Sequence, residues 1–318
     1  MSSYLLRRLG LTLAQLLVVS TLLFFFIHLL PGDPAGVILG SSDLHQPSRE
    51  QLDAVRRQLG LERSILVQYV GYLGGLMRGD LGTSFLTGRP VALDLGLRFG
   101  RTAQLVIPSI ILSSLIGIVL GVLAARSRGR WQDAALTTAG IVGHSLPVFV
   151  TGNLMVLLFA IYLGWLPSSG FTEFTGDARA AIAYMIMPVT ALAIGRAAAT
   201  MRMTRTTVVE QLTLDYVRTA RSKGLAERVV LYRHVVRNAL IPVIAVVGLQ
   251  MGLMFSGAIV VEAIFNWPGM GSLLLKSIGG RDYPVIQGAI LLTSTIFVLV
   301  NLCTDLVYAY LNPQIRYR

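Results

Sequence analysis

The sequence alternates long apolar runs with more polar connections. The runs cover residues 9–30, 103–125, 134–163, 182–201, 239–261 and 287–310. Each run is long enough to cross a bilayer as a helix, which takes about 20 residues. Backbone polar groups in lipid must find partners within the segment, so the pattern predicts helices rather than open strands. We therefore expect an all-α, polytopic membrane protein with about six transmembrane helices.

The composition also favours a membrane protein over a soluble domain. Hydrophobic residues make up 54% of the 318 residues and charged residues only 14%, and the mean hydropathy is +0.67. A soluble domain of this length needs more polar surface to cover its core. The first run follows Arg7 and Arg8 but is too long for the apolar part of a typical signal peptide, so we expect a retained first span. The single cysteine, Cys303, excludes an intramolecular disulfide and a cysteine-rich metal site.

The formal net charge of +11 is unevenly distributed. Basic residues gather at both ends of the chain and on the second and fourth connections, whereas the first, third and fifth connections are nearly balanced. The basic positions are Arg7, Arg8, Arg126, Arg128, Arg130, Arg202, Arg205, Arg218, Arg221, Lys223, Arg228, Arg233, Arg237, Arg316 and Arg318. Because cytoplasmic loops carry an excess of Lys and Arg, we expect both termini on the cytoplasmic side of the membrane, and no nucleic-acid partner.

The chain divides near residue 100 into two expected regions. Residues 1–100 hold the first transmembrane helix and an extracytoplasmic region, and residues 101–318 hold a core of about five transmembrane helices with a cytoplasmic loop at 204–238. In the first region, Ser48 and Gln51 have the spacing of a capping box, and Gly60 can end the helix that follows. We expect a short amphipathic helix over 48–59, on the extracytoplasmic side.

The fourth connection has the pattern of two short helices at the membrane surface. Asp215 can cap the first helix, and Gly224 can end it in a left-handed turn. A second short helix is predicted over 226–237, and Pro242 then lies near the start of the fifth span, where its missing N–H costs little. Composition alone would also suit a basic amphipathic segment resting on anionic lipid.

The order of residues in this connection resembles the ATPase-docking loop, or EAA loop, of ABC import permeases. It is most similar to the loop of the dipeptide, oligopeptide and nickel subfamily. Thr219 and Ala220 take the two alanine positions of that motif, Gly224 takes its glycine, and Leu240 and Pro242 match its end. The stretch from 224 to 242 is longer than in the general motif, as is usual in the peptide subfamily.

This resemblance implies that the first short helix docks in a groove of a separate ATPase subunit. Arg218 replaces the acidic first position of the general motif, a departure that the peptide subfamily shares. The residues implied in docking are Asp215, Tyr216, Arg218, Thr219, Ala220, Arg221, Lys223, Gly224 and Leu225.

Further stretches resemble the same family in the expected order, over nearly the whole chain. They are Pro31-Gly32-Asp33-Pro34, Gly79-Asp80-Leu81-Gly82-Thr83-Ser84, Val261-Glu262 through Pro268-Gly269 to Gly271, Arg281-Asp282-Tyr283-Pro284, and Asn301 through Asp305 to Tyr317. Each alone is weak, since the first is merely a turn and helix stop by itself. Together they resemble the B-type subunit of a dipeptide or oligopeptide permease, which implies the transmembrane fold of a type I ABC importer.

Polar and kink-forming residues within or beside the spans are the candidates for a solute pathway or gate. They are His144, Ser145, Pro147, Arg196, Met251 and Glu262. Ionisable groups in a membrane are costly and often functional, and Pro147 is expected to kink the third span. Structural roles compete with this interpretation: a lone histidine more often packs than binds a ligand, and Asp305 can anchor the tail with Arg316.

No Gly-x-x-x-x-Gly-Lys-Ser/Thr motif is present, and no hydrolytic triad or metal cluster is evident. We therefore expect a permease subunit that is not an enzyme and holds no cofactor, with ATP and Mg²⁺ bound by partner subunits. The resemblance implies a second homologous permease, two ATP-binding subunits and an extracytoplasmic solute-binding protein, all at the cytoplasmic membrane of a bacterium.

The same resemblance implies alternating access and favours dipeptides or oligopeptides as the cargo. Nickel, glutathione and other small solutes share these motifs and stay open as alternatives. A stand-alone secondary transporter or channel would show ionisable residues near mid-membrane or an inverted repeat, and the sequence offers few of the former and no obvious sign of the latter. An intramembrane enzyme would need paired catalytic groups, which are not evident.

Overall fold

The computed structural model describes residues 2–29, 32–39 and 47–311. Within these ranges the chain is helical, apart from connecting loops and one isolated bridge between Thr83 and Pro90. Five helices are long and apolar enough to cross a membrane, and a bent helix pair supplies a sixth span if it is counted as one. The prediction of an all-α polytopic membrane protein is confirmed.

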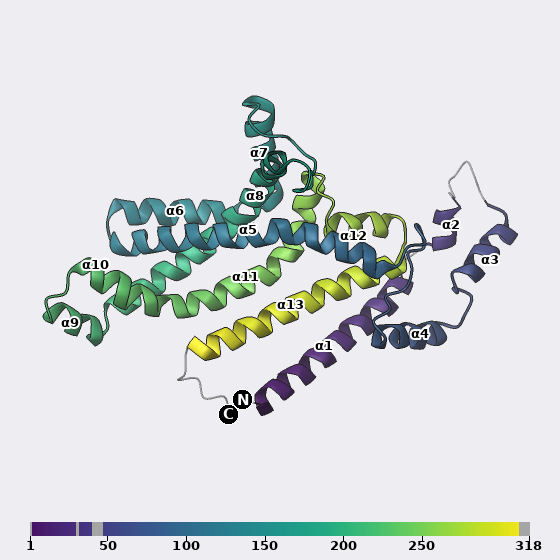
Figure 1. Cartoon of the computed structure of the whole chain (residues 1–318), viewed down its shortest axis with the longest axis horizontal. Coiled ribbons are helices and arrows are strands. Elements are labelled where there is room, and N and C mark those ends of the chain that lie inside the picture. The colour runs from purple at the N-terminus through teal and green to yellow at the C-terminus, as the bar shows by residue number, and fades with distance from the viewer. Residues whose placement is uncertain (1, 30–31, 40–46, 312–318) are drawn as a thin grey trace. The chain divides into compact units, whose positions relative to one another are not determined.

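The order of the helices along the chain can be followed in Figure 1. Their bounds are α1 (Ser2–Leu29), α2 (Pro34–Ile38), α3 (Arg49–Gln58), α4 (Ile65–Met77), α5 (Val91–Arg126), α6 (Trp131–Ser145), α7 (Val148–Met155), η1 (Val156–Tyr162), α8 (Ala178–Leu212), α9 (Asp215–Ser222), α10 (Glu227–Val229), η2 (Val230–Val236), α11 (Arg237–Ile264), α12 (Met270–Gly279) and α13 (Tyr283–Leu311). The segments η1 and η2 are π-helical. The sequence pattern predicted neither α4 nor α12.

Contacts group the chain into two compact units. Unit 1 comprises residues 1–101 and 268–296, and unit 2 comprises residues 102–267 and 297–318. Unit 1 therefore joins the N-terminal region to a segment that begins only at Pro268, far along the chain. The helices α5 and α13 contribute residues to both units.

Apolar side chains from distant parts of the sequence form the core of unit 1. Leu23 and Ile27 of α1 pack with Tyr283 and Ile286 of α13. A second cluster joins the start of α5 to α13, with Val91, Leu95, Val285 and Ala289 all buried. These contacts hold α12 and the first half of α13 in the same unit as the N-terminal region.

Three of the family-like stretches meet in unit 1. The buried carboxylate of Asp282 accepts a hydrogen bond from the Ser84 hydroxyl at 2.5 Å and another from the Phe85 backbone N–H at 3.0 Å. Next to Asp282, the Arg281 guanidinium lies against Gly32, where any Cβ would clash with it. The structure thus gives these stretches a shared packing role, and Pro31 of the first stretch lies outside the described residues.

The helix predicted over 48–59 is present as α3 (Arg49–Gln58). Its capping box is complete: the Gln51 N–H donates to the Ser48 hydroxyl at 3.3 Å, and the Ser48 N–H donates to the Gln51 side chain at 2.9 Å. Asp33 caps α2 and also pairs with Arg56 at 2.7 Å, which raises the pKa of the Arg56 guanidinium. The described part of α1 ends at Leu29, before this stretch, in keeping with a helix stop, and Asp33 and Pro34 then begin the next helix.

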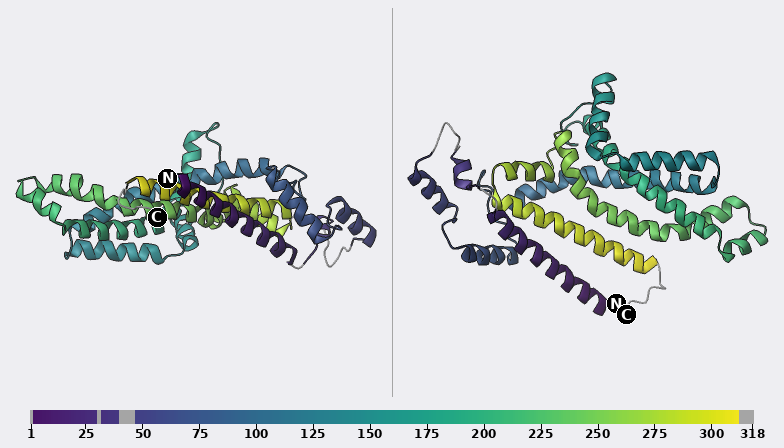
Figure 2. Two further views of the ribbon diagram at one scale, coloured as in Figure 1. Left: turned by 90° about the horizontal axis from the view of Figure 1, so that it is seen from below. Right: turned by 180° about the vertical axis from the view of Figure 1, so that it is seen from behind.

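Helices α8 and α11 pack side by side in unit 2, and α6 and α7 pack against α8 (Figure 2). Two glycines of α5 face α8 at very short range. A Cβ on Gly117 would stand 2.7 Å from the Ala197 carbonyl oxygen, and one on Gly121 would stand 2.7 Å from the Met201 carbonyl oxygen. The absence of side chains at these two positions lets α5 approach the backbone of α8.

The third predicted span is broken rather than kinked. Helix α6 ends at Ser145, α7 begins at Val148, and the two segments are bent by 98°. Pro147 disfavours a helical conformation for the residue before it, and Leu146 is accordingly extended, with ψ of 120°. The prediction of a kinked but continuous helix over 134–163 is wrong for this reason.

Candidate functional site

The candidate docking segment begins with α9 and ends in a left-handed turn. Gly224 has φ of +72°, and its N–H donates to the Arg221 carbonyl at 2.9 Å, as predicted for a helix end. Asp215 does not cap the helix. Leu214 occupies the cap position in an extended conformation, and Asp215, one residue later, accepts a hydrogen bond from the Arg218 guanidinium at 3.3 Å.

The chain after Gly224 runs into the fifth span without a break. The segments α10, η2 and α11 follow one another directly, so residues 227–264 form one helical element of 38 residues. The prediction of a separate helix over 226–237 is therefore wrong at its C-terminal end. Pro242 lies inside α11 and not near its start as a first-turn residue.

One face of α9 is buried in unit 2. Val217 is 0% and Ala220 is 6% exposed, and both belong to a cluster with the ends of α5, α8 and α11 and with η2. The other members of the cluster are Val122, Ala125, Val208, Val230, Leu231, Val235 and Ala239. This packing ties α9 to three membrane-spanning helices at one end of the unit (Figure 1).

The opposite face of α9 is exposed. The exposed members of the predicted docking set are Asp215, Arg218, Thr219, Arg221, Lys223, Gly224 and Leu225. Tyr216 is partly buried, and its hydroxyl donates to the Gln211 side chain at 2.7 Å. Ala220 faces inward, so within this structure it can support a docking surface but cannot touch a partner.

An ion pair closes the turn at Gly224. The Arg221 guanidinium donates to the Glu227 carboxylate at 2.6 Å and 3.1 Å. This hydrogen bond raises the pKa of Arg221. Both side chains are exposed, so the pair adds little stability, and its main effect is on the shape of the turn.

A cavity of about 270 Å³ lies beside the break between α6 and α7. Its lining comes from α6, α7, α8, α11 and the residue Leu146 at the break. We call it the Arg196 cavity, and its lining residues are His144, Leu146, Val148, Thr151, Ala191, Leu192, Gly195, Arg196, Met254 and Gly257.

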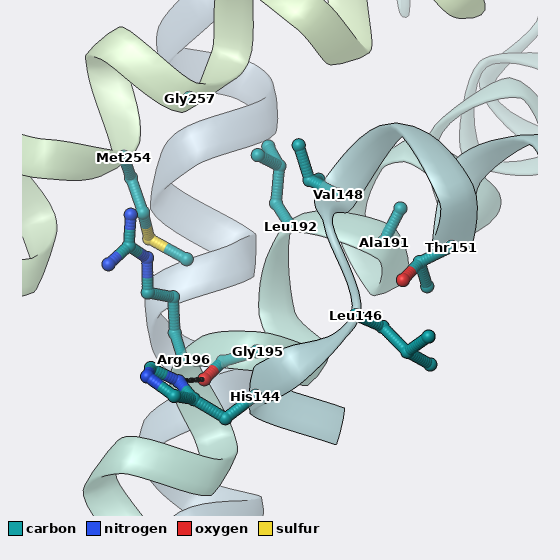
Figure 3. A pocket seen from close by; sticks show the side chains of 10 residues that line it. All are labelled: His144, Leu146, Val148, Thr151, Ala191, Leu192, Gly195, Arg196, Met254 and Gly257. Atoms are coloured by element: carbon teal, nitrogen blue, oxygen red, sulfur yellow. Dashed lines mark hydrogen bonds between the residues drawn. The ribbon is translucent and has the colours of Figure 1, made fainter. Parts of the chain in front are cut away.

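Arg196 and His144 supply the ionisable groups of this cavity. In Figure 3 the Arg196 side chain extends toward Met254, and the His144 ring lies beside its base. The His144 Nδ1–H donates to the Gly195 carbonyl at 3.2 Å. Among the described residues, no hydrogen bond or ion pair engages Arg196. A guanidinium near the centre of a membrane helix costs about 2.5–3.5 kcal/mol to insert, so an unpaired one calls for a functional explanation.

Some of the predicted pathway residues line the Arg196 cavity, and others do not. His144 and Arg196 line it, and Ser145 and Pro147 lie at the adjoining break. Met251 is not among the lining residues, whereas Met254, one turn later, is. Thr151 and Gly257 also line the cavity but were not predicted as pathway residues, because small residues are common throughout these spans.

Glu262 lies away from this cavity in a packed position. It is 0% exposed, and its carboxylate accepts a hydrogen bond from the Thr102 hydroxyl at 2.6 Å. Nearby, the Gly170 N–H donates to the Phe265 carbonyl at 2.8 Å, and Trp267 packs edge-on against Phe171. The stretch around Glu262 thus packs the end of α11 against the start of the core part of α5 and the connection before α8.

Comparison with known proteins decides the family. Residues 117–317 match the family described as the binding-protein-dependent transport system inner membrane component, and residues 1–115 match the N-terminal part of such membrane components. The chain belongs to this family. The permease is 42% identical to the glutathione transport system permease protein GsiC of Salmonella choleraesuis (strain SC-B67), over 100% of both chains. It is 41% identical to the protein of the same name from Escherichia coli (strain K12), again over 100% of both.

Two solved structures share the fold of the permease. An inward-facing structure of the MetNI methionine ABC transporter matches with a TM-score of 0.56 and 16% identity, covering 69% of the permease and 96% of that chain. An amino acid ABC transporter crystallised with histidines matches with a TM-score of 0.50 and 14% identity, covering 70% and 95%. At these identities the likeness shows the fold alone.

These findings confirm the predicted family and the importer class. The permease is the membrane subunit of an ABC importer, a multi-span helical protein of the bacterial inner membrane that works with other components of the importer. It is a permease and not the catalytic subunit of such a system.

Proposed function

We propose that the permease imports glutathione, driven by ATP hydrolysis in partner subunits that dock on the exposed face of α9. The observation that supports coupling between the ATPase and the membrane helices is that α9 has one exposed face and one buried face. Its outer face is free for a partner, and its inner face is packed on the ends of α5, α8 and α11. A partner that moves α9 therefore acts directly on these helices.

The proposed mechanism is alternating access. Closure of an ATPase dimer moves α9, and the spans packed on it then open the pathway on the extracytoplasmic side. A ligand shifts such an equilibrium only by its difference in affinity for the two states, and ATP bound to the partner subunits supplies that difference. A second permease and a solute-binding protein complete the proposed assembly.

The choice of glutathione rests on the relatives that carry this substrate in their names and align with the permease from end to end. It replaces dipeptides and oligopeptides as the leading candidate, which the motifs alone favoured. Glutathione is itself a short peptide, so the docking and gating proposals do not change. Its two carboxylates and one ammonium group give it a net negative charge at neutral pH.

Docking is tested by a bulky side chain on the exposed face of α9. The Thr219→Trp variant is expected to lose co-purifying ATP-binding subunits, because an indole there prevents close approach of a partner. The matched control is Thr175→Trp, at an exposed threonine in the connection before α8. Equal recovery of the ATP-binding subunits with both variants would rule out docking at Thr219.

The substrate is tested with the complete transporter in proteoliposomes. We expect uptake of radiolabelled glutathione that requires both ATP and the solute-binding protein, and that unlabelled dipeptides or Ni²⁺ in tenfold excess leave largely intact. Uptake of a dipeptide or of nickel without uptake of glutathione would reject the proposed cargo and leave the docking result unaffected.

A further inference from the structure

We propose that the Arg196 cavity is a substrate subsite, in which the Arg196 guanidinium binds a carboxylate of the solute during its passage. This inference deepens the proposed function and rests on it for the identity of the solute. Five segments of unit 2 build the cavity, and Arg196 extends from α8 into its interior (Figure 3).

Charge in the cavity favours an anion. Arg196 is partly buried, and no described residue pairs with it. The side chains that line the cavity include no carboxylate. A guanidinium presents parallel N–H donors that match both oxygens of a carboxylate, so a bound carboxylate supplies the missing partner. A free divalent cation is repelled at the same place, which gives selectivity against it.

His144 provides the complementary group. Because its Nδ1–H donates to the Gly195 carbonyl at 3.2 Å, the neutral ring keeps Nε2 as an acceptor. A substrate N–H or ammonium can donate to this nitrogen while the carboxylate rests on Arg196. The pair therefore suits the amino-acid-like end of a short peptide, which carries both kinds of group.

The volume and the apolar wall of the cavity limit the size and the polarity of a ligand that can bind there. Its apolar wall is formed by Leu146, Val148, Ala191, Leu192 and Met254. The volume of about 270 Å³ lies just below the range of about 300–1,000 Å³ that is common for ligand sites. The cavity accordingly fits one end of a short peptide, with its methylene groups against the apolar wall.

Transport by the complete importer gives the first test. In proteoliposomes with the solute-binding protein, Arg196→Gln is expected to reduce glutathione uptake about tenfold or more, as loss of a close charge pair predicts. Arg196→Lys is expected to retain more uptake than Arg196→Gln, and both variants are expected to keep co-purifying ATP-binding subunits, because Arg196 lies outside the docking segment. The control is Arg202→Gln, an exposed arginine of the same helix outside the cavity. Equal uptake by Arg196→Gln and Arg202→Gln would overturn the subsite.

Charge-selective labelling gives a second test that does not depend on the cargo. Cys303 is replaced by serine, and Val148→Cys places one thiol on the cavity wall. The complete transporter is treated with an anionic or a cationic methanethiosulfonate reagent. We expect Arg196→Gln to lower the ratio of anionic to cationic labelling rates about tenfold, and Arg202→Gln to leave it unchanged.

The outcomes separate the two proposals. A ratio that falls with Arg196→Gln, in a transporter that imports no glutathione, supports the anion subsite and rejects the proposed cargo. A ratio that stays the same, or a Val148→Cys thiol that neither reagent reaches in the complete transporter, overturns the subsite even if glutathione is imported.

Discussion

At the residue scale, glycines without side chains set how closely the helices of unit 2 approach one another. A Cβ on Gly117 would stand 2.6 Å from the Thr200 Cβ and 2.7 Å from the Ala197 carbonyl oxygen. Neither group can move away without shifting the backbone of α8. Small residues at helix contacts are typical of membrane proteins, where close packing replaces the hydrophobic effect as a driving force.

Gly117→Ala is therefore expected to destabilise the permease by about 1–3 kcal/mol, the usual cost of forcing extra volume into a packed site. Gly100→Ala is the matched control, because it lies in the same helix with no heavy atom within 4 Å of the added Cβ. Thermal unfolding of both variants in detergent measures the difference. Equal midpoints for the two variants would contradict the close contact between α5 and α8.

At the element scale, a largely buried ion pair joins α6 to α8. The Arg205 guanidinium donates to both carboxylate oxygens of Asp133, at 2.6 Å and 2.7 Å. Asp133 also accepts a hydrogen bond from the Gly129 N–H at 3.2 Å, so it fixes the connection before α6 as well. The side chain of Asp133 is only 8% exposed and that of Arg205 is 30% exposed, so most of the pair is shielded from water.

Asp133→Ala is expected to cost about 3 kcal/mol of stability, the low end for a broken buried pair, because Arg205 stays partly exposed. A double variant, Asp133→Ala with Arg205→Met, is expected to recover part of this loss, since no unpaired charge is left. Glu62→Ala, which removes an exposed pair with Arg57, serves as the control and should change stability by less than about 0.5 kcal/mol. If Asp133→Ala unfolds at the same temperature as Glu62→Ala, the pair does not hold α6 to α8.

The elements also show what the sequence could and could not predict. Local signals worked well: the capping box at Ser48 and the left-handed turn at Gly224 depend on neighbouring residues and are both present. Predictions that needed long-range packing did worse. The pattern predicted neither that η2 would carry helix on into α11 nor that the bend at Pro147 would reach 98°, because Pro147 alone fixes where the helix is interrupted and not the angle between its two parts.

In the candidate sites, too, local sequence signals were predicted correctly and contacts between distant segments were not. The docking segment was found from its ordered motif, but only packing shows that Ala220 faces inward. Arg196 and His144 were identified as polar residues within spans, and their shared cavity depends on the fold of α6, α7 and α8. Glu262, which was predicted as a pathway residue, is fully buried and accepts a hydrogen bond from Thr102, a contact between residues 160 positions apart that the sequence pattern could not show.

At the scale of the whole molecule, the distribution of charge predicts how the chain crosses the membrane. The basic connections on 126–130 and 202–237 are expected in the cytoplasm, and the connections on 31–101 and 163–178 outside it. This predicted orientation places α9 on the side of the proposed ATP-binding subunits and α3 on the side of the proposed solute-binding protein.

Reporter fusions test the orientation. Alkaline phosphatase joined after Gly60 or Thr175 is expected to be active, and after Arg128 or Arg318 inactive, because the enzyme folds only outside the cytoplasm. Green fluorescent protein at Arg318 is expected to fluoresce. Active phosphatase at Arg318 would place the C-terminus outside and remove the docking proposal with it.

The unbroken run of helix from α10 to the end of α11 has a mechanical consequence. Its 38 residues span about 57 Å at 1.5 Å per residue, nearly twice the thickness of about 30 Å of a bilayer's hydrocarbon layer. The π-helical η2 and Pro242 both lie in this run close to the docking turn, and both are features at which helices bend. Under the proposed mechanism, movement of α9 is therefore expected to bend the run near residues 230–242 as well as to tilt the membrane part of α11.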